Sequence, residues 1–245
     1  MGILVTRPEP DNETTAAALR RRGHEVFLAP MLRCEPVPVL DTGDESYGAV
    51  IVTSANALRV LEGHPLLRRI AEVPLFAVGK HTASVARKAG FGDIHTADGD
   101  ADALRKKIAE ELDPARTRPL LYLAGADLAQ DLAGPLARDG FDIITRTAYR
   151  MTMAGTLPDA IVAALALQQI NAILHYSRRS ARAFFEAASI AGMEITALGI
   201  AQCCLSQAVA GVAHEAGAAR VMVAAKPTET ALFATLDRLV RPPAD

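Results

Sequence analysis

The sequence predicts an α/β protein, in which β-strands alternate with α-helices around mostly parallel sheets. Short apolar runs alternate along the chain with amphipathic stretches of about ten to fifteen residues, which is the pattern of repeated βα units. A glycine follows most of the amphipathic stretches and an apolar run then begins, as expected where a helix ends in a left-handed cap. Half of the 245 residues are hydrophobic, so apolar side chains can cover both faces of such sheets.

The apolar runs define the strands, which we predict at residues 3–6, 25–28, 49–53, 75–78, 120–124, 172–175, 197–200 and 220–223. The amphipathic stretches define the helices, which we predict at residues 13–22, 82–89, 101–112, 128–138, 180–191, 205–215 and 228–239. Five of these helices are closed by a glycine: Gly23, Gly90, Gly140, Gly192 and Gly217.

Two segments interrupt this alternation. Residues 33–39 carry prolines at alternate positions, and residues 145–152 form a β-rich run that no helix follows. Because proline confines a strand to a sheet edge or an isolated ribbon, we predict that both segments are connecting strands outside either sheet.

The chain also repeats itself. Residues 49–54 resemble residues 172–177, and residues 76–79 resemble residues 198–201, in the same order and at nearly equal separations. Two such matches predict two homologous α/β halves.

Composition and motifs exclude several classes of function. The formal net charge of -2 argues against a generic nucleic-acid binder, which would carry a basic domain. The sequence has no apolar run long enough for a membrane span and no signal peptide, so we expect a cytoplasmic protein without membrane contact. Cys34, Cys203 and Cys204 lack the spacing of a zinc site or a disulfide framework, so no metal is expected.

The common catalytic motifs are also missing. There is no glycine-rich dinucleotide loop, no P-loop, no G-x-S-x-G elbow and no H-E-x-x-H zinc motif. A reaction without a cofactor, which relies on positioning and one mild acid, fits what remains.

The turns that follow the strands are the expected ligand site, because parallel sheets bind ligands at the carboxyl ends of their strands. These turns are rich in small hydroxyl side chains and helix-start N–H groups, which suit anionic ligands, although plain helix capping explains any single turn equally well. His175 ends a predicted core strand and favours a structural role, whereas His81 lies in such a turn and remains open between the two roles. Tyr149 lies on the second connecting segment, as either an aromatic contact or a functional phenol.

Taken together, several short motifs resemble the uroporphyrinogen-III synthase family. They occur in the order of that family at residues 4–8, 51–57, 78–83, 121–125, 148–150 and 226–232, so that the match runs from Ile3 to about Leu239. The resemblance implies two flavodoxin-like parallel-sheet domains joined by a two-stranded antiparallel β-ladder. One domain would comprise residues 1–33 plus 153–245 and the other residues 40–146, with residues 34–39 and 147–152 as the ladder and the substrate between the domains.

The family's reaction closes the linear tetrapyrrole hydroxymethylbilane to uroporphyrinogen III, with inversion of ring D and loss of water. Departure of the ring A hydroxyl gives an azafulvene cation, which the substituted carbon of ring D attacks to form a spiro intermediate. That intermediate fragments and recloses in the flipped orientation. The resemblance therefore implies a lyase without metal or cofactor, acting on a substrate with eight carboxylates.

The resemblance also suggests roles for individual residues. Tyr149 aligns with the family's ladder tyrosine, which is proposed to help the departing hydroxyl, and is the predicted catalytic residue. Cys203-Cys204 stands where relatives often have a hydroxyl pair, which weakens the transfer of a polar contact there. Substrate contacts are predicted from the turns at Arg7, Thr53, Ser54, Asn56, Gly79, Thr82, Gly125, Tyr176, Ser177, Arg178, Arg179 and Ser206.

For partners, the resemblance implies a monomer that receives its linear tetrapyrrole by transient hand-over from hydroxymethylbilane synthase, without nucleic acid or membrane. Two alternatives remain at this point. One is a non-catalytic cytosolic two-domain module of the same fold that binds or senses an anion. The other is a diverged enzyme of this fold that acts on another polyanion.

Overall fold

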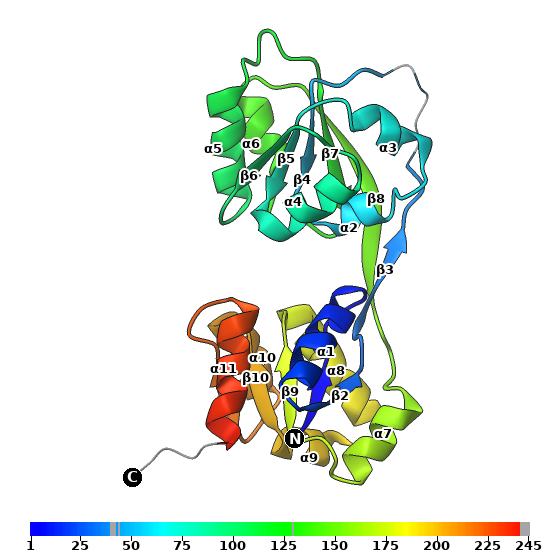
Figure 1. Cartoon of the computed structure of the whole chain (residues 1–245), viewed down its shortest axis with the longest axis vertical. Coiled ribbons are helices and arrows are strands. Elements are labelled where there is room, and N and C mark those ends of the chain that lie inside the picture. The colour runs from blue at the N-terminus through cyan, green and yellow to red at the C-terminus, as the bar shows by residue number, and fades with distance from the viewer. Residues whose placement is uncertain (40–42, 44, 129, 241–245) are drawn as a thin grey trace. The chain divides into compact units, whose positions relative to one another are not determined.

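The computed structural model describes residues 1–39, 43, 45–128 and 130–240, which form two compact units. Unit 1 combines Met1–Arg33 with the described part of Thr152–Asp245, and unit 2 is the described part of Cys34–Met151. Each unit contains a parallel sheet with helices on both faces (Figure 1). The predicted α/β class with two parallel sheets is confirmed.

Unit 1 is built on a five-stranded parallel sheet in the order β11-β10-β9-β1-β2. When the strands are numbered along the chain within the unit and the sheet is read from β2 to β11, this order is 2-1-3-4-5, which is the flavodoxin order. The elements are β1 Gly2–Val5, α1 Asp11–Arg21, β2 Glu25–Leu28, α7 Asp159–Ala166, β9 Ala172–His175, α8 Arg178–Ile190, α9 Glu194–Gly199, β10 Ala201–Cys204, α10 Gln207–Glu215, β11 Val221–Val223 and α11 Glu229–Val240.

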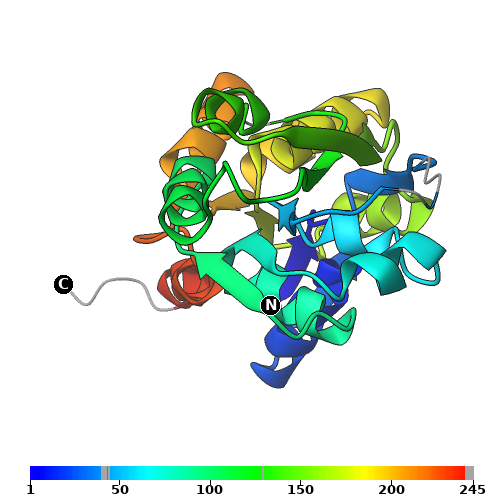
Figure 2. The ribbon, with the colours of Figure 1, turned by 90° about the horizontal axis from the view of Figure 1, so that it is seen from above.

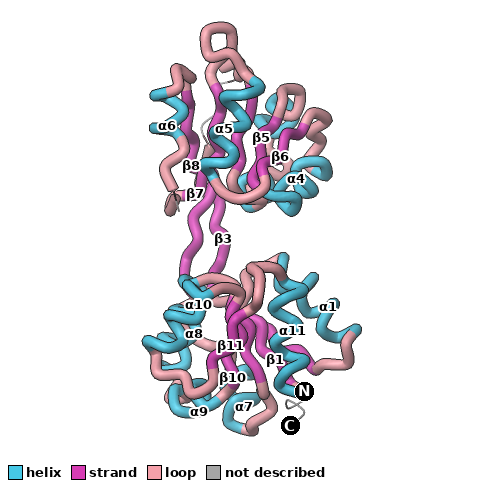
Figure 3. The backbone as a smooth tube through the Cα atoms, turned by 90° about the vertical axis from the view of Figure 1, so that its left-hand side faces the viewer, coloured by secondary structure: helices cyan, strands magenta, loops and turns pink. Residues whose placement is uncertain are grey.

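Alternating side chains of the unit 1 strands pack on the two faces of the sheet, as the two-residue period of a strand requires. On one face, Leu4 and Ile173 pack with Phe184 of α8 and with α7 and α9. On the other face, Ile3 and Val5 pack with Leu19 of α1 and with α11. Figures 2 and 3 show the two helix layers, with α8 and α10 on one side of the strands and α1 and α11 on the other.

Unit 2 contains a six-stranded sheet in the order β3-β8-β7-β4-β5-β6. The five strands β4 to β8 are parallel. When they are numbered along the chain and the sheet is read from β6 to β8, their order is 3-2-1-4-5, which differs from the flavodoxin order of unit 1. The elements are β4 Ala49–Val52, α2 Asn56–Arg59, α3 Pro65–Ile70, β5 Leu75–Val78, α4 Gly79–Lys88, β6 Ile94–Ala97, α5 Ala101–Glu111, β7 Leu120–Gly125, α6 Ala133–Arg138 and β8 Ile143–Met153, with β3 Leu32–Pro36 at the edge.

The core of unit 2 is divided in the same way. Val50 and Val52 face a cluster built from α2, α3 and α4, whereas Ala49 and Ile51 face a cluster built from α5 and α6. All four side chains of β4 are therefore buried, as expected for the central strand of a parallel sheet.

The two sheets have the same spatial order once the ends of the chain are ignored. If unit 1 is followed from β9 through β10 and β11 and then through β1 and β2, its order also becomes 3-2-1-4-5. The units are therefore circular permutations of one arrangement, in agreement with the predicted match of residues 49–54 with 172–177. The predicted match of residues 76–79 with 198–201 is out of register, because residues 198–199 end α9 and β10 begins at Ala201. In this correspondence the turn after β9 matches the turn after β4, and the turn after β1 matches the turn after β7.

The two connecting segments belong to a sheet, which corrects the prediction that they lie outside both. Residues of β8 pair in parallel with β7 from Ile143 to Tyr149, and β3 adds to the other side of β8. β3 leads from unit 1 into unit 2 and β8 leads back, so these hydrogen-bonded neighbours run in opposite directions. Prolines remain compatible with β3 because it is an edge strand.

The predicted strand at residues 197–200 is wrong. Glu194–Gly199 forms α9, and the strand begins at Ala201. Residues 202–204, which lie between the strand predicted at 197–200 and the helix predicted at 205–215, are the buried end of β10. Apolar character alone could not distinguish a short buried helix from a strand.

Candidate functional site

Each unit has one position where ligand binding is favoured by the topology. At the switch point of a doubly wound sheet, helices leave neighbouring strands toward opposite faces and open a crevice at the carboxyl ends. In unit 2 this position lies between β4 and β7, and in unit 1 between β9 and β1.

The unit 2 switch point contains a pocket of about 290 Å³. Four of the predicted site residues, Thr53, Ser54, Gly125 and Tyr149, line it together. The other lining residues are Val78, Asp100, Ala101, Tyr122, Asp127, Leu128 and Gln130.

Tyr149 is held against this pocket by backbone pairing and by the absence of a neighbouring side chain. The N–H of Ala126 donates to the carbonyl oxygen of Tyr149 at 2.8 Å. A Cβ atom on Gly125 would lie 2.8 Å from Cζ and 2.9 Å from the hydroxyl oxygen of Tyr149, so the ring can occupy its place only because residue 125 is glycine. Burial raises the pKa of the phenol, and the hydrogen bond from Ser54 partly opposes that rise.

A second phenol in the pocket was not predicted from the sequence. Tyr122 is 1% exposed and its hydroxyl lies 3.4 Å from Oγ1 of Thr53. Burial raises the pKa of Tyr122, so both phenols stay protonated at neutral pH. Tyr122 lies inside an otherwise apolar strand, and nothing in that pattern separates a pocket-lining phenol from a core aromatic.

The charges of the pocket come from carboxylates. Asp100 and Asp127 are exposed at its rim, and Asp100 also caps α5 by accepting the N–H of Ala103 at 3.1 Å. Neither arginine nor lysine occurs among the described residues that line the pocket. The pocket therefore favours a neutral or cationic group over a carboxylate.

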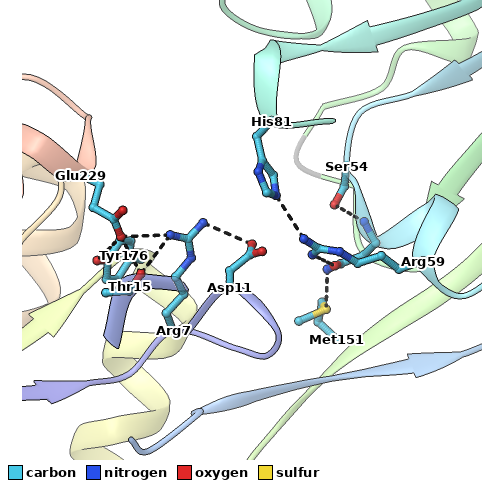
Figure 4. A network of polar contacts seen from close by, with 10 residues as sticks. Arg7, Asp11, Thr15, Ser54, Arg59, His81, Met151, Tyr176 and Glu229 are labelled. Carbon is cyan, nitrogen blue, oxygen red and sulfur yellow. Dashed lines mark hydrogen bonds and ion pairs between the residues drawn. The ribbon is translucent and has the colours of Figure 1, made fainter. Parts of the chain in front are cut away.

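A cationic group lies elsewhere in unit 2, on α2. Nη1 of Arg59 donates to Oδ1 of Asn56 at 3.1 Å, and Nη2 lies 3.2 Å from Nε2 of His81 (Figure 4). Nδ2 of Asn56 donates to Sδ of Met151 at 3.5 Å. The predicted residue Asn56 thus positions a guanidinium that the sequence did not reveal.

Two other predicted residues lie on α4. Gly79 adopts φ of 76°, a left-handed conformation that favours glycine, at the point where β5 turns into the helix. Thr82 is 5% exposed in the packed face of α4, which does not favour a direct substrate contact.

In unit 1 the switch point is filled by a network of charged and hydroxyl groups. Arg7 pairs with Asp11 at 3.2 Å and with Glu229 at 3.3 Å, and its guanidinium lies 4.9 Å from the centre of the Tyr176 ring (Figure 4). Oε1 of Glu229 also accepts the hydroxyls of Thr15 at 2.5 Å and Tyr176 at 2.8 Å. The structure thus brings the predicted residues Arg7 and Tyr176 together, but two carboxylates of the chain already pair with Arg7.

Burial is the main cause that raises the pKa of Tyr176, and the neighbouring carboxylate of Glu229 raises it further. The phenol is therefore a stable hydrogen-bond donor at neutral pH. Glu229 belongs to a motif that carried the family resemblance, yet no role for it followed from the sequence.

The remaining predicted residues lie at helix starts of unit 1. Ser177 is the N-cap of α8, with its hydroxyl accepting the N–H of Ser180 at 3.1 Å. Ser206 is the N-cap of α10 without a side-chain cap hydrogen bond. Arg178 and Arg179 are exposed in the first turn of α8.

A buried polar network lies beneath these turns. Nε2 of His175 lies 2.8 Å from Oε1 of Gln202, whose amide donates to two backbone carbonyls at 2.8 Å. Complete burial lowers the pKa of His175 to about 4, and Gln202 partly opposes the shift. The neighbouring Cys203 and Cys204 are fully buried, so neither thiol is accessible to a ligand from solution.

Within the described residues, no group of His, Cys, Asp and Glu side chains could hold a metal ion. Over the same residues, none of the helices is sufficiently long and apolar to span a bilayer.

Comparisons of the sequence with family models and of the structure with solved structures point to the same family. A family model described as Uroporphyrinogen-III synthase HemD matches residues 13–234. The structure of uroporphyrinogen-III synthetase from Helicobacter pylori is similar with a TM-score of 0.65 and 18% identity, over 98% of this chain and 99% of that one. A mutant uroporphyrinogen III synthase from Thermus thermophilus gives a TM-score of 0.56 and 18% identity, over 98% of both chains. No curated protein sequence matches this chain significantly.

Proposed function

The chain belongs to the uroporphyrinogen-III synthase HemD family, and on this premise we propose that it converts hydroxymethylbilane to uroporphyrinogen III with loss of water. The observation that carries the proposal is the phenol of Tyr149 at the unit 2 switch point, beside Ser54 and the backbone of Gly125.

The first step is departure of the ring A hydroxyl. A phenol that stays protonated at neutral pH can donate a hydrogen bond to this oxygen and assist it to leave as water. Its acidity is weak, and burial weakens it further, so we assign Tyr149 a modest share of the rate. The leaving group is labile, because the pyrrole nitrogen supplies the electrons that expel it.

Departure of the hydroxyl leaves an azafulvene cation. The carboxylates of Asp100 and Asp127 and the ring of Tyr122 make the surroundings of the pocket favourable for positive charge. The substituted carbon of ring D then attacks, the spiro intermediate fragments, and reclosure gives the inverted ring. These steps are redox neutral, so the proposal requires no cofactor.

Substrate carboxylates need other partners, because the pocket offers them no cation. We assign them to the exposed guanidinium groups of Arg178 and Arg179, to Arg59 and to the helix starts at Ser177 and Ser206. Holding several carboxylates at once would favour the folded substrate over the head-to-tail closure that occurs without a catalyst.

The test is conversion of hydroxymethylbilane by the purified chain, followed by oxidation of the product and separation of isomers I and III. The proposal predicts isomer III in excess and faster consumption than in buffer. Isomer I alone, formed at the uncatalysed rate, would contradict it. Tight binding of hydroxymethylbilane without conversion would instead identify a binding module.

A further inference from the structure

One carboxylate of this chain lies where a ligand is expected. Oε1 of Glu229 accepts hydrogen bonds from Arg7 at 3.3 Å, Thr15 at 2.5 Å and Tyr176 at 2.8 Å. These donors come from the β1–α1 turn, α1 and the β9–α8 turn, which meet at the switch point of unit 1 (Figure 4).

The donors form a site for a carboxylate. A guanidinium and two hydroxyls can satisfy one carboxylate oxygen from three directions, and the guanidinium adds the opposite charge. The site is partly open to solvent at Arg7 and Glu229, whose side chains are 25% and 33% exposed, whereas Thr15 is fully buried. A carboxylate that arrives from solution can therefore reach Arg7 directly, and the remaining donors once Glu229 has moved.

The charges at the site oppose such an arrival while Glu229 remains in place. Arg7 is the only cation in this network of described residues, and it already faces Asp11 and Glu229. A third carboxylate would meet net negative charge. An anionic ligand can therefore use Arg7 well only after one of these carboxylates leaves.

We propose that the carboxylate of Glu229 occupies the binding site of a substrate carboxylate. When the substrate binds, its carboxylate displaces Glu229 and accepts the hydrogen bonds of Arg7, Thr15 and Tyr176. The inference rests on the proposed function only in requiring a substrate with several carboxylates. Glu229 is the first residue of α11, so rotation of its side chain releases the site without unwinding the helix. Asp11 remains paired with Arg7 and keeps the guanidinium in position.

Displacement gives the site a means of selection. For an anion with one carboxylate, the free energy needed to displace Glu229 is offset only by the contacts of that carboxylate. An octacarboxylate also gains binding free energy from contacts made by its other carboxylates. The exchange thus discriminates against small carboxylates that are common in solution.

The decisive experiment measures binding of uroporphyrin I, a fluorescent octacarboxylate that the reaction does not consume. Glu229→Gln keeps the shape of the side chain and removes its charge, so it should tighten binding about three- to tenfold. Glu194→Gln is the matched control, because it removes the same charge from an exposed first-turn position of α9 in the same unit. It should leave the affinity unchanged within about twofold at equal ionic strength.

Tyr176→Phe provides a second test that does not depend on the stability of the first variant. Loss of one donor should weaken uroporphyrin I binding several-fold if substrate takes over the site, and should have no effect if Glu229 only anchors α11. Unchanged or weaker binding in folded Glu229→Gln would overturn the exchange, as would failure of both the parent chain and this variant to bind uroporphyrin I.

Conversion of hydroxymethylbilane by the same variants separates the two proposals. If Glu229→Gln binds uroporphyrin I more tightly but no isomer III forms with any variant, the exchange stands and the proposed function fails. If isomer III forms while the affinity does not respond to Glu229→Gln, the function stands and the exchange fails.

Discussion

At the residue scale, the phenol of Tyr149 is the group whose chemistry can be isolated most cleanly. Tyr149→Phe removes one hydroxyl and keeps the ring that packs on the unit 2 core, so we expect the fold and substrate binding to persist. Turnover should fall by about 100-fold or less, because hydrogen-bond assistance to a labile leaving group belongs at the low end of acid catalysis. Steady-state kinetics with hydroxymethylbilane and a melting curve check both statements.

An unchanged rate for Tyr149→Phe, with an unstable Tyr149→Ala, would leave the ring with only a packing role.

Gly125 offers an independent test of the same geometry. A methyl group at this position would lie within 2.8 Å of the Tyr149 ring, so either the ring or the irregular backbone pairing at Gly125 must shift. Gly125→Ala should therefore lower turnover by about 10- to 100-fold, as expected when a catalytic group is misplaced by about 1 Å. The kinetics should worsen more than the stability of the fold.

Gly211→Ala is the control for this substitution. Gly211 lies inside α10 with open space around its would-be Cβ, so alanine should stabilise the helix by about 0.5–1 kcal/mol and leave turnover unchanged. Equal losses of activity in both variants would remove the argument for a specific contact at Gly125.

The sequence was informative for residues at strand ends and on the connecting segments, and uninformative for a buried phenol inside a core strand. Ser54, Gly125 and Tyr149 were predicted as site residues and share one pocket. Tyr122 was missed because a phenol inside a buried strand has the same pattern as a core aromatic, and Glu229 because its partners are distant in sequence. Long-range contacts of this kind leave no local signal.

At the element scale, Ser177 has two roles that mutation can separate. Its hydroxyl caps α8, so Ser177→Ala should cost about 1 kcal/mol of unfolding free energy. Asparagine and aspartate are equally good caps, and only aspartate adds a negative charge. If this helix start contacts a substrate carboxylate, Ser177→Asp should raise KM several-fold above that of Ser177→Asn.

Equal KM values for these two variants would limit Ser177 to its capping role. Urea unfolding of all three variants supplies the matching stability data.

His175, which contacts Gln202 of the neighbouring strand β10, should make the stability of unit 1 sensitive to acid. Its pKa is about 4 in the folded chain and about 6.5 when unfolded, so the unfolded state binds more protons between these values. The stabilisation is therefore complete above about pH 6.5 and is lost as the pH falls toward 4, by roughly 3 kcal/mol in total. Urea unfolding at several pH values measures this slope.

His175→Gln should flatten the profile while lowering stability at pH 7, because it removes the titrating ring from the aromatic contacts with Phe184 and Phe185. Burial also lowers the pKa of His24, but His24 is present in the parent protein and in His175→Gln, so its contribution to the pH dependence cancels when the two are compared. An equally steep slope in both would assign the acid sensitivity to other groups.

Elements were predicted well where apolar runs and glycine stops coincide, and poorly where tertiary context decides. The strand at 172–175 and the helix closed by Gly192 have both features. Ala197 packs in the core from helix α9, so its apolar neighbours suggested a strand that does not exist. β8 was assigned to a separate ribbon because its pairing with β7, which places it in the sheet, joins residues more than 20 positions apart, such as Leu120 and Ile143.

At the scale of the whole molecule, the permuted repeat explains why the two switch points are comparable. The turns after β4 and β7 in unit 2 correspond to the turns after β9 and β1 in unit 1. In unit 2 these turns surround a phenol and carboxylates, whereas in unit 1 they surround an arginine that pairs with carboxylates. One arrangement of strands thus supplies a site suited to a cation and a site suited to a carboxylate. The repeat of residues 49–54 in residues 172–177 marks one of these pairs of turns, whereas the turns after β7 and β1 occur in the opposite order along the chain.

The permuted repeat also predicts that unit 1 folds without unit 2, whichever of its two chain segments comes first. Met31 and Ala154 are joined by a backbone hydrogen bond of 3.0 Å, and Met1 and Leu239 line one pocket, so both pairs of ends are close enough for short linkers. One chain joins residues 1–31 to 154–240, and the other joins 154–240 to 1–31. Both keep the core clusters on both faces and all five strands of the sheet. We expect cooperative urea unfolding of both chains at similar midpoints, since chain order does not alter the packed contacts. Circular dichroism that shows helix without a cooperative transition in both chains would mean that the unit 1 core depends on unit 2. Failure of the permuted chain alone would locate the fault in the new linker between α11 and β1.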